Sequence, residues 1–451
     1  MDNIHFIGIG GISMSGIAEL MISRGYRVSG SDSHETDITD RLAGMGAAIG
    51  YPQKAENIPA DTDTVVMTAA IHEDNPELME ARRRGLRIET RAEFLGKIMK
   101  EYRTPVAVAG THGKTTTTAM ISEILMSAQK DPTISIGGVL RDIGGNFRVG
   151  ADEFFVMEAC EYTNSYHSFY PKIGVILNVE ADHLDFFKDI EDIRRSFHRF
   201  AENIPDDGVL IINKGIEGVE EITDGLKCRV VTFGDVPGAD YRPENISVDE
   251  YARPTFEAVH GGERKEYSLG VHGYHNVLNA LSAIAAAEEL GLSHEDIARG
   301  LKRFAGTDRR FEVKGKLNGF TIIDDYAHHP TEIHATISTA KKYPHHELWV
   351  VFQSHTYTRT KALMHDFAKE LAAADHVICA EIYPARETDN LGISGETLAA
   401  EIRKEGTDCY YFPTFKEIEK FITDTLVDND LLITMGAGDV VNIGDELLKN
   451  S

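Results

Sequence analysis

The chain has 451 residues, a length that predicts about three domains instead of one hydrophobic core. Hydrophobic residues make up 42% and charged residues 26% of it, as in an ordered globular protein, and 46 basic against 72 acidic residues leave a net charge of −26. This charge argues against nucleic-acid partners and anionic membrane surfaces. Because the start is acidic and no apolar run approaches the ~18 residues of a membrane span, we expect a soluble cytoplasmic protein without membrane insertion.

The cysteines show no metal or redox motif. They are Cys160, Cys228, Cys379 and Cys409, which are widely separated and lack a Cys-x-x-Cys spacing. We therefore expect reduced thiols, as is usual in a cytoplasm.

The first predicted domain, residues 1–103, opens with a strand, a glycine-rich turn and a helix. A second strand ends in an acid 22 positions after Gly10, the spacing of a ribose-binding carboxylate in a dinucleotide fold. The candidate nucleotide-binding residues are Gly8, Gly10, Gly11, Ile12, Ser13, Ser15 and Asp32. Because Ser13 replaces the third glycine of the fingerprint, NAD binding and purely structural glycines remain alternatives to another nucleotide. The pattern predicts a Rossmann-like domain.

A candidate phosphate-binding loop opens the second predicted domain, residues 104–308. It follows an apolar run and precedes a helical pattern that starts at Ala119. The loop residues are Gly110, Thr111, His112, Gly113, Lys114, Thr115 and Thr116. Glycines let backbone N–H groups surround phosphate oxygens, Lys114 neutralises terminal phosphates, and Thr115 offers a hydroxyl to Mg²⁺. The loop is shorter than a common P-loop, and the alternative is a glycine-rich turn with a solvated lysine.

Polar side chains follow two later strands of this domain. One apolar strand ends in Glu158, and the next is followed by His183. An open α/β sheet places its site at the carboxyl ends of its strands, so we expect Glu158, His183 and Thr115 to hold Mg²⁺ beside the phosphates of ATP. For each residue alone, a surface acid or a capping histidine is an equal alternative.

Two further segments complete this domain. Residues 230–268 contain alternating β-type residues and predict a small antiparallel appendage. Next, His275, Asn276 and Asn279 lie within about one helical turn, which suits contacts to an adenine edge or, alternatively, helix capping.

The third predicted domain, residues 309–451, repeats the α/β pattern. Strands near residues 320–325, 347–353, 376–379 and 431–435 all deliver polar residues at their carboxyl ends. Arg310, in the preceding linker, is either solvated or contacts the γ-phosphate of ATP. We therefore predict an α/β protein with a Rossmann-like N-terminal domain, a central P-loop ATPase-like domain with a mainly parallel sheet, and a C-terminal Rossmann-like domain.

A predicted ATP-binding loop, together with a second predicted nucleotide-binding domain, indicates a ligase or a kinase. Six motifs in chain order resemble the Mur ligase family along essentially the whole chain: residues 110–116, Glu158, and residues 178–185, 275–280, 309–311 and 324–330. Within that family, residues 8–15, 324–332 and 383–387 resemble the alanine-adding branch.

The resemblance implies a cytoplasmic step of peptidoglycan synthesis that uses ATP and Mg²⁺. The lactyl carboxylate of UDP-N-acetylmuramate would take the γ-phosphoryl group, and the amine of L-alanine would attack the acyl phosphate to give an amide, ADP and phosphate. The first domain would bind UDP, and domain closure would exclude water.

The resemblance also implies a role for each site residue. Lys114, Glu158, His183, Arg310 and His328 would be catalytic. His275, Asn276 and Asn279 would bind ATP, with Asn276 and Asn279 facing adenine. Asp325 would contact the ribose and Arg310 the phosphates. The alanine site would comprise Tyr326, His328 and Arg359, with Arg359 pairing the carboxylate.

Two departures and two alternatives accompany the resemblance. Thr356 stands where some members carry a second arginine, and no lysine lies between Lys188 and Lys214, where other branches have a modified one.

A family member that recycles whole murein peptides is the nearest alternative enzyme. A non-catalytic nucleotide-sugar-binding regulator is the alternative from another class. A monomer and a homodimer are equally compatible with the sequence.

Overall fold

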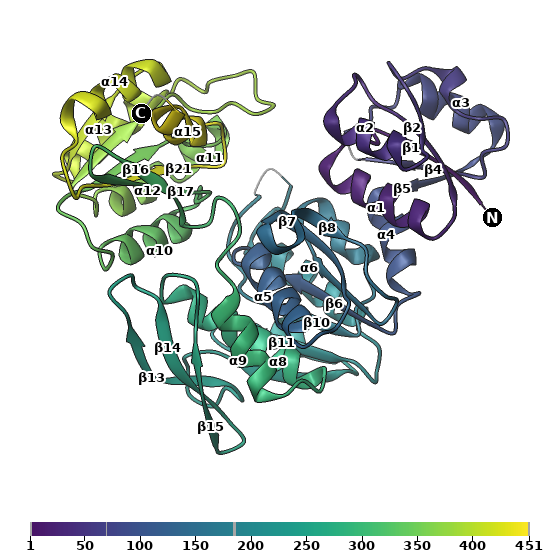
Figure 1. The fold of residues 1–451 in the computed structure, drawn as a ribbon, viewed down its shortest axis with the longest axis horizontal. Helices are drawn as coiled ribbons and strands as arrows, with labels where there is room; N and C mark the ends of the chain where they lie inside the picture. The colour runs from purple at the N-terminus through teal and green to yellow at the C-terminus, as the bar shows by residue number, and fades with distance from the viewer. Residues whose placement is uncertain (1, 69, 184–185, 450–451) are drawn as a thin grey trace. The chain divides into compact units, whose positions relative to one another are not determined.

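The computed structural model describes residues 2–68, 70–183 and 186–449 of the chain (Figure 1). These residues separate into two compact units. Unit 1 comprises Met1–Arg242, Val259–Gly262 and Asn279–Gly300, and unit 2 comprises Pro243–Ala258, Glu263–Leu278 and Leu301–Ser451. Among the described residues, no helix combines the length and the apolar character that crossing a membrane requires.

The N-terminal sheet of unit 1 is parallel, with the order β3-β2-β1-β4-β5 in the described part of the chain. Its strands are β1 Asn3–Ile7, β2 Arg27–Ser31, β3 Ala48–Gly50, β4 Thr64–Met67 and β5 Arg87–Thr90. The helices are α1 Ile12–Ser23, α2 Asp37–Gly44, α3 Pro76–Arg84 and α4 Arg91–Met99, with the short turn η1 Ala55–Asn57. Strand and helix alternate, which confirms the predicted Rossmann-like start.

The central sheet of unit 1 has the order β12-β11-β10-β6-β9-β7-β8 over the described ranges, and only the β7–β8 pair is antiparallel. Its strands are β6 Thr104–Ala109, β7 Thr133–Leu140, β8 Gly145–Arg148, β9 Phe154–Glu158, β10 Ile173–Ile176, β11 Val209–Asn213 and β12 Arg229–Phe233. Val108 pairs with Glu158 and Ala109 with Ile176, so the carboxyl ends of β9 and β10 flank the loop after β6.

Several helices follow or connect these strands. They are α5 Lys114–Ser127, α6 Ile190–Glu202, α7 Val219–Thr223, α8 His275–Glu289 and α9 His294–Arg303, with the short turns η2 Arg141–Ile143 and η3 Tyr162–Ser168. Helix α5 begins at Lys114, earlier than the predicted Ala119, because the threonines after the loop already adopt helical geometry.

Two helices of the N-terminal sheet make close contacts with the central part of unit 1 through glycines. A Cβ on Gly16 of α1 would lie 2.3 Å from the ring of Phe147 on β8. Beside it, the Asn146 side chain donates to the carbonyl oxygen of Ile12 at 3.4 Å. A Cβ on Gly96 of α4 would lie 1.8 Å from the carbonyl oxygen of Ser168. These contacts leave no room for a methyl group.

Replacing Gly96 with alanine is expected to lower the free energy of unfolding of unit 1 by about 1–3 kcal/mol, because backbone must move to admit the methyl group. Thermal unfolding followed by circular dichroism measures the loss. The matched control is Gly44→Ala in α2, where a Cβ meets no heavy atom within 4 Å. An equal melting temperature for the two variants would contradict the contact.

A small sheet with the order β13-β14-β15 forms the predicted appendage. Its strands are β13 Arg242–Val248, β14 Pro254–His260 and β15 Glu263–Ser268. Only Gly261 and Gly262 join β14 to β15, both with positive φ, so these strands form an antiparallel hairpin. The predicted start at residue 230 was wrong, because β12 belongs to the central parallel sheet.

The C-terminal sheet of unit 2 has the order β16-β17-β21-β18-β19-β20 where the structure describes it, and is parallel except for the β16–β17 pair. Its strands are β16 Glu312–Leu317, β17 Phe320–Asp325, β18 Leu348–Phe352, β19 His376–Cys379, β20 Asp408–Tyr411 and β21 Leu431–Met435. Strands β16 and β20 were not predicted, because their charged residues and half-exposed side chains hide the strand pattern.

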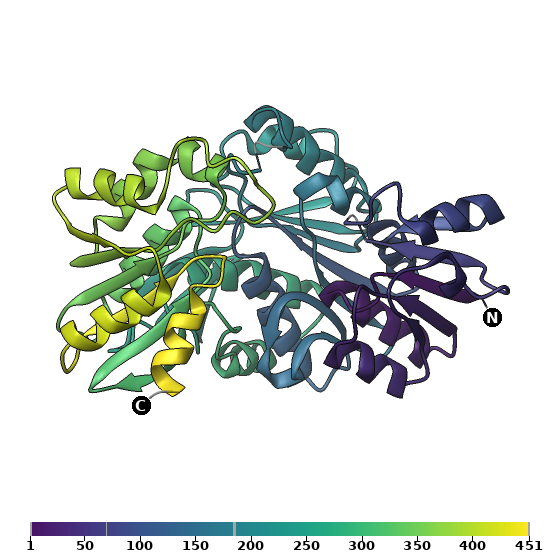
Figure 2. The ribbon, with the colours of Figure 1, turned by 90° about the horizontal axis from the view of Figure 1, so that it is seen from above.

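Helices cover both faces of this sheet, as Figure 2 shows for the green and yellow parts of the chain. They are α10 Pro330–Ala340, α11 Tyr357–Ala362, α12 Met364–Leu371, α13 Gly395–Lys404, α14 Phe415–Thr425 and α15 Val441–Lys449. Ile333 and Phe367 pack in the core on one face, and Ile418 and Ile443 pack in the core on the other. Burial on both faces explains the continuous apolar runs of the central strands.

Candidate functional site

The loop after β6 has the geometry of a phosphate-binding loop. Gly110 has φ of +143° and Gly113, which caps α5, has φ of +83°, conformations that favour glycine. The loop therefore leads directly into the N-terminus of α5, where unpaired N–H groups and the helix dipole favour anions. A Cβ on Gly113 would lie 2.6 Å from Oδ1 of Asn279, which places this predicted adenine contact against the loop.

Asn178 fixes the middle of the loop. Its Oδ1 accepts from the His112 N–H at 2.7 Å, and its Nδ2 donates to the His112 carbonyl oxygen at 3.0 Å. The Thr111 N–H also donates to the main-chain oxygen of Asn178, at 3.2 Å. The side-chain amide thus holds the main chain of His112 through two hydrogen bonds. This role was not predicted from the sequence, although Asn178 is the last residue of a predicted strand.

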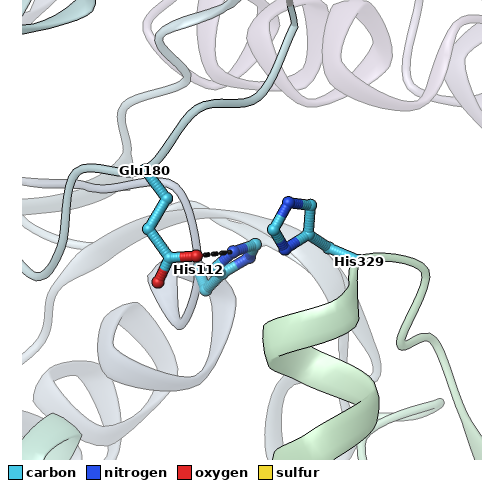
Figure 3. A group of neighbouring side chains, drawn as sticks. All are labelled: His112, Glu180 and His329. Atoms are coloured by element: carbon cyan, nitrogen blue, oxygen red, sulfur yellow. Dashed lines mark ion pairs between the residues drawn. The ribbon is translucent and has the colours of Figure 1, made fainter. Parts of the chain in front are cut away.

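A second contact from the same segment reaches the loop. The Glu180 N–H donates to Oγ1 of Thr111 at 2.9 Å. Figure 3 shows the carboxylate of Glu180 directed at the His112 ring, with Oε2 3.5 Å from Nε2. His329, also drawn there, belongs to unit 2. The stretch after β10 therefore orders the loop through main-chain and side-chain groups.

Lys114 lies almost fully enclosed beside the loop. Its Nζ donates to the carbonyl oxygens of Gly110 at 2.5 Å and Thr111 at 3.1 Å. It also donates to Oε2 of Glu161 at 2.9 Å, and Glu161 is only 3% exposed. Burial alone lowers the pKa of Lys114, but the Glu161 carboxylate outweighs this and raises the pKa above its ordinary value. Lys114 is therefore a permanent cation.

Thr115 and Glu158 meet as predicted for a metal site. The Thr115 hydroxyl donates to Oε2 of Glu158 at 2.9 Å, and the Gly137 N–H donates to the same oxygen at 2.8 Å. A Cβ on Gly137 would lie 2.6 Å from this oxygen, so the carboxylate is held against the backbone of β7. A hydroxyl and a carboxylate are hard oxygen ligands, and they fit Mg²⁺.

His183, the other predicted ligand, lies beside Glu161. Its Nε2 is 3.7 Å from Oε1 of Glu161 and 3.8 Å from Oδ2 of Asp182. The ring packs against that of Tyr162, with centroids 4.6 Å apart, and φ of His183 is +54°. The structure thus gives His183 and Lys114 a common neighbour, whereas its part in metal binding stays a prediction. Leu184 and Asp185 of the resembling motif lie outside the described residues.

The N-terminal turn brings its predicted residues together. Gly8 has φ of +81°, and the Gly10 N–H donates to Oδ2 of Asp32 at 2.8 Å. The Ser15 hydroxyl donates to the Ile12 carbonyl oxygen at 3.0 Å, while the Ile12 side chain is 64% exposed. Asp32 therefore closes the turn after β1. Binding of a nucleotide by this turn stays a prediction.

In unit 2, Glu332 on α10 links two predicted catalytic residues. Its carboxylate lies 3.6 Å from Nη1 of Arg310 and 3.2 Å from Nδ1 of His328. It also accepts from the His328 N–H at 3.1 Å. The Arg310 guanidinium lies over the ring of Tyr326 at 5.2 Å. Arg310, Tyr326 and His328 were predicted from the sequence, whereas no role was predicted for Glu332, although it is four positions from His328 at the start of a helix.

The remaining predicted residues of unit 2 lie on two helices, His275 and Asn276 on α8 and Arg359 on α11. The Asn276 side chain donates to the His272 carbonyl oxygen at 2.7 Å. Neighbouring His275 lines a cavity of about 160 Å³ together with residues of α10. Arg359 lies on α11, whose first N–H groups donate to the Glu387 carboxylate. Their contacts to substrates stay predictions.

Asp325, at the end of β17, is held by two backbone groups. Oδ2 accepts from the Phe311 N–H and Oδ1 from the Ala327 N–H, both at 2.8 Å. Burial raises the pKa of Asp325 to about 6, while Arg310 and these N–H groups act in the opposite direction. The carboxylate thus fixes the linker at Phe311 and the loop after β17 at Ala327. Its contact to the ribose of ATP stays a prediction.

This raised pKa predicts a pH dependence. Because the folded pKa exceeds the unfolded one, the contribution of Asp325 to stability is complete below about pH 4 and is lost as the pH rises through about 6. Relative to wild type, Asp325→Asn should therefore gain up to about 3 kcal/mol between pH 4 and 7. Thermal unfolding at a series of pH values measures this gain. The exposed Asp366→Asn is the control, and a pH-independent difference would contradict the prediction.

Family models match the chain in three consecutive stretches. They are the Mur ligase family catalytic domain over residues 3–103, the Mur ligase middle domain over residues 108–287, and the Mur ligase glutamate ligase domain over residues 309–438. The chain belongs to the Mur ligase family.

Individual Mur ligases resemble the chain over its full length. A UDP-N-acetylmuramate–L-alanine ligase from Lachnospira eligens is 55% identical, covering 99% of this chain and 98% of the relative. The crystal structure of a UDP-N-acetylmuramate-alanine ligase from Thermotoga maritima is 32% identical, with a TM-score of 0.82 and coverage of 100% and 99%. A murein peptide ligase from Psychrobacter arcticus is 27% identical, with a TM-score of 0.69 and coverage of 100% and 98%.

One departure from the Mur ligase pattern has a structural context. Thr356, at the position predicted to be an arginine in some members, has φ of +68°, and its carbonyl oxygen accepts from the Thr360 hydroxyl at 2.6 Å. A β-branched residue seldom adopts this conformation, so the backbone at the start of α11 is tightly constrained. Arg359 is held one turn into that helix.

Proposed function

We propose that this chain is an ATP-dependent UDP-N-acetylmuramate–L-alanine ligase of cytoplasmic peptidoglycan synthesis. It would join the lactyl carboxylate of UDP-N-acetylmuramate to L-alanine through an acyl phosphate, releasing ADP and phosphate. The observation that carries the proposal is 55% identity to ligases of this name over 99% of the chain. We assign UDP-sugar binding to residues 1–103, ATP binding to residues 104–308, and amino-acid binding to residues 309–451.

In unit 1, the phosphate loop would hold ATP and Lys114 would balance the charge of the transferring phosphoryl group. The hydroxyl of Thr115 and the carboxylate of Glu158 would hold Mg²⁺, with His183 as the third proposed ligand. When bound, Mg²⁺ would offset the negative charge on the phosphates. Lys114 supplies a fixed cation because Glu161 and two carbonyl oxygens orient its ammonium.

In unit 2, Arg310 and His328 are supported by one carboxylate, that of Glu332. We assign Arg310 to the phosphates and His328 to the incoming amine. Tyr326 packs under Arg310 and would line the alanine site. Arg359 would pair the alanine carboxylate. Since Thr356 adds no second cation there, we expect a single bidentate pairing to fix the amino acid.

A murein peptide ligase is the nearest alternative, because one such enzyme is 27% identical over the whole chain. The alanine ligases are favoured by their higher identity, 46–55% among several relatives of that name. A binding protein without catalysis is disfavoured by the intact set of Lys114, Thr115 and Glu158, which a regulator does not need.

The test is an amide-formation assay with purified protein, ATP, Mg²⁺ and UDP-N-acetylmuramate. L-alanine, the murein tripeptide or no amine is added, and product and ADP are measured by chromatography and mass spectrometry. We expect an amide with L-alanine alone. An amide formed only with the tripeptide would transfer the proposal to the recycling ligase, and no amine-dependent ADP release would refute catalysis.

A further inference from the structure

Glu161 is a buried carboxylate that no predicted role accounts for. It follows β9 and is only 3% exposed, yet it lies between two charged or chargeable groups of the phosphate site. Oε2 is 2.9 Å and Oε1 3.3 Å from Nζ of Lys114, and Oε1 is 3.7 Å from Nε2 of His183. A carboxylate is buried at a cost unless it is paired, so these contacts determine what Glu161 does.

The segment after Glu161 is held in an unusual conformation. Thr163 and Asn164 have φ of +56° and +58°, in the left-handed region that costs about 1–3 kcal/mol for a residue other than glycine. Asn164 donates its N–H to the Glu161 carbonyl oxygen at 2.9 Å and accepts from the buried Ser196 hydroxyl of α6 at 2.5 Å. Tyr162 within the same segment packs against the His183 ring.

Such strain persists only where the surrounding structure enforces it, and it concentrates at functional sites. Here its effect is specific. The two positive-φ residues turn the chain just after Glu161 and Tyr162, of which Glu161 contacts Lys114 and Tyr162 packs against His183. The segment therefore fixes one carboxylate against both residues.

The ammonium of Lys114 has three N–H groups, and the structure directs them at two loop carbonyls and Glu161. A phosphate oxygen can accept from Lys114 only by replacing one of these partners. The carbonyls belong to the loop itself, so Glu161 is the partner that a phosphate displaces or crowds. A carboxylate and a phosphate repel each other at such distances, which weakens nucleotide binding.

We propose that Glu161 is a positioning residue of the phosphoryl-transfer site: it aligns Lys114 and His183 for the reaction and competes with the nucleotide phosphate for Lys114. The inference rests on the proposed ligase activity. It predicts opposite effects of one substitution, tighter binding of nucleotide and slower turnover, because removing the carboxylate frees Lys114 and also removes the shared anchor.

The experiment compares Glu161→Gln with wild type in two assays. Calorimetric titration with ADP in EDTA should give a Kd about tenfold lower for the variant, since a nearby negative charge is gone. The ligase assay with MgATP should give a kcat about 10- to 100-fold lower, as for other residues that orient catalytic groups. Glu153→Gln, an exposed change at the opposite end of β9, is the control for loss of one charge.

Unchanged or weaker ADP binding by Glu161→Gln, or an unchanged kcat, would overturn the proposal. Glu161→Asp tests the same idea if the glutamine variant does not fold: it keeps the charge, so the Kd for ADP should stay within about twofold of wild type while kcat falls. A wild-type kcat in Glu161→Asp would overturn the positioning role. Failure of wild type to form any amide would refute the ligase activity but would leave the ADP titrations interpretable.

Discussion

Replacing Lys114 with methionine is expected to reduce amide formation by about 10³-fold or more, because it removes the cation that donates to the loop carbonyl oxygens of Gly110 and Thr111. Methionine keeps the length and the apolar stem of the side chain. The assay is ADP release with UDP-N-acetylmuramate and L-alanine, and ADP binding in EDTA should weaken as well.

This change leaves the buried carboxylate of Glu161 without its cation, which destabilises the fold by itself. The double variant Lys114→Met/Glu161→Gln separates the two effects. It should recover the wild-type melting temperature to within about 2 °C but not the activity, because a buried unpaired charge is absent while the catalytic cation is still missing. Turnover above a few per cent of wild type in either variant would contradict the role of Lys114.

Replacing Glu158 with glutamine is expected to lower kcat by about 10²- to 10³-fold and to raise the Mg²⁺ concentration needed for half-maximal activity. The amide oxygen can still accept from the Thr115 hydroxyl and the Gly137 N–H, so the fold should be retained. The substitution therefore removes the negative charge of residue 158 but keeps the shape of its side chain.

The measurement is the ligase rate as a function of Mg²⁺ concentration, with Glu153→Gln as the control. The ligase rate and the Mg²⁺ dependence of Glu153→Gln should equal those of wild type, since Glu153 is exposed at the other end of β9. If Glu158→Gln shows an unaltered Mg²⁺ dependence, the carboxylate does not hold the metal.

The sequence was sufficient to predict the parts of the site that depend on local geometry. The glycines at positions 110 and 113 adopt positive φ, so the glycine-rich loop could be predicted from the sequence, whereas the following helix begins at Lys114, before the predicted Ala119. Glu158 was predictable for a similar reason, because parallel strands deliver their carboxyl-terminal residues to one edge of a sheet.

The residues that hold these groups in place were not predictable in the same way. Asn178 and Glu161 act through contacts between segments far apart in the chain, and Glu332 reaches Arg310 of the preceding linker as well as nearby His328. No local pattern distinguishes these three residues from ordinary polar residues. The same reason explains the error at β12. A short β-type run after a turn does not reveal which sheet it joins, since the pairing of β12 with β11 is a tertiary contact.

The contact of Gly16 with Phe147 has a consequence for exchanging parts between relatives. Gly16 on α1 leaves just enough room for the aromatic ring of Phe147 on β8. An N-terminal domain (residues 1–103) taken from another species therefore fits only if its residue 16 is equally small. Chimeric proteins joined near residue 103 should therefore fold well when the β7–β8 hairpin around residue 147 is exchanged together with residues 1–103. Across many genomes, these two positions should change in concert.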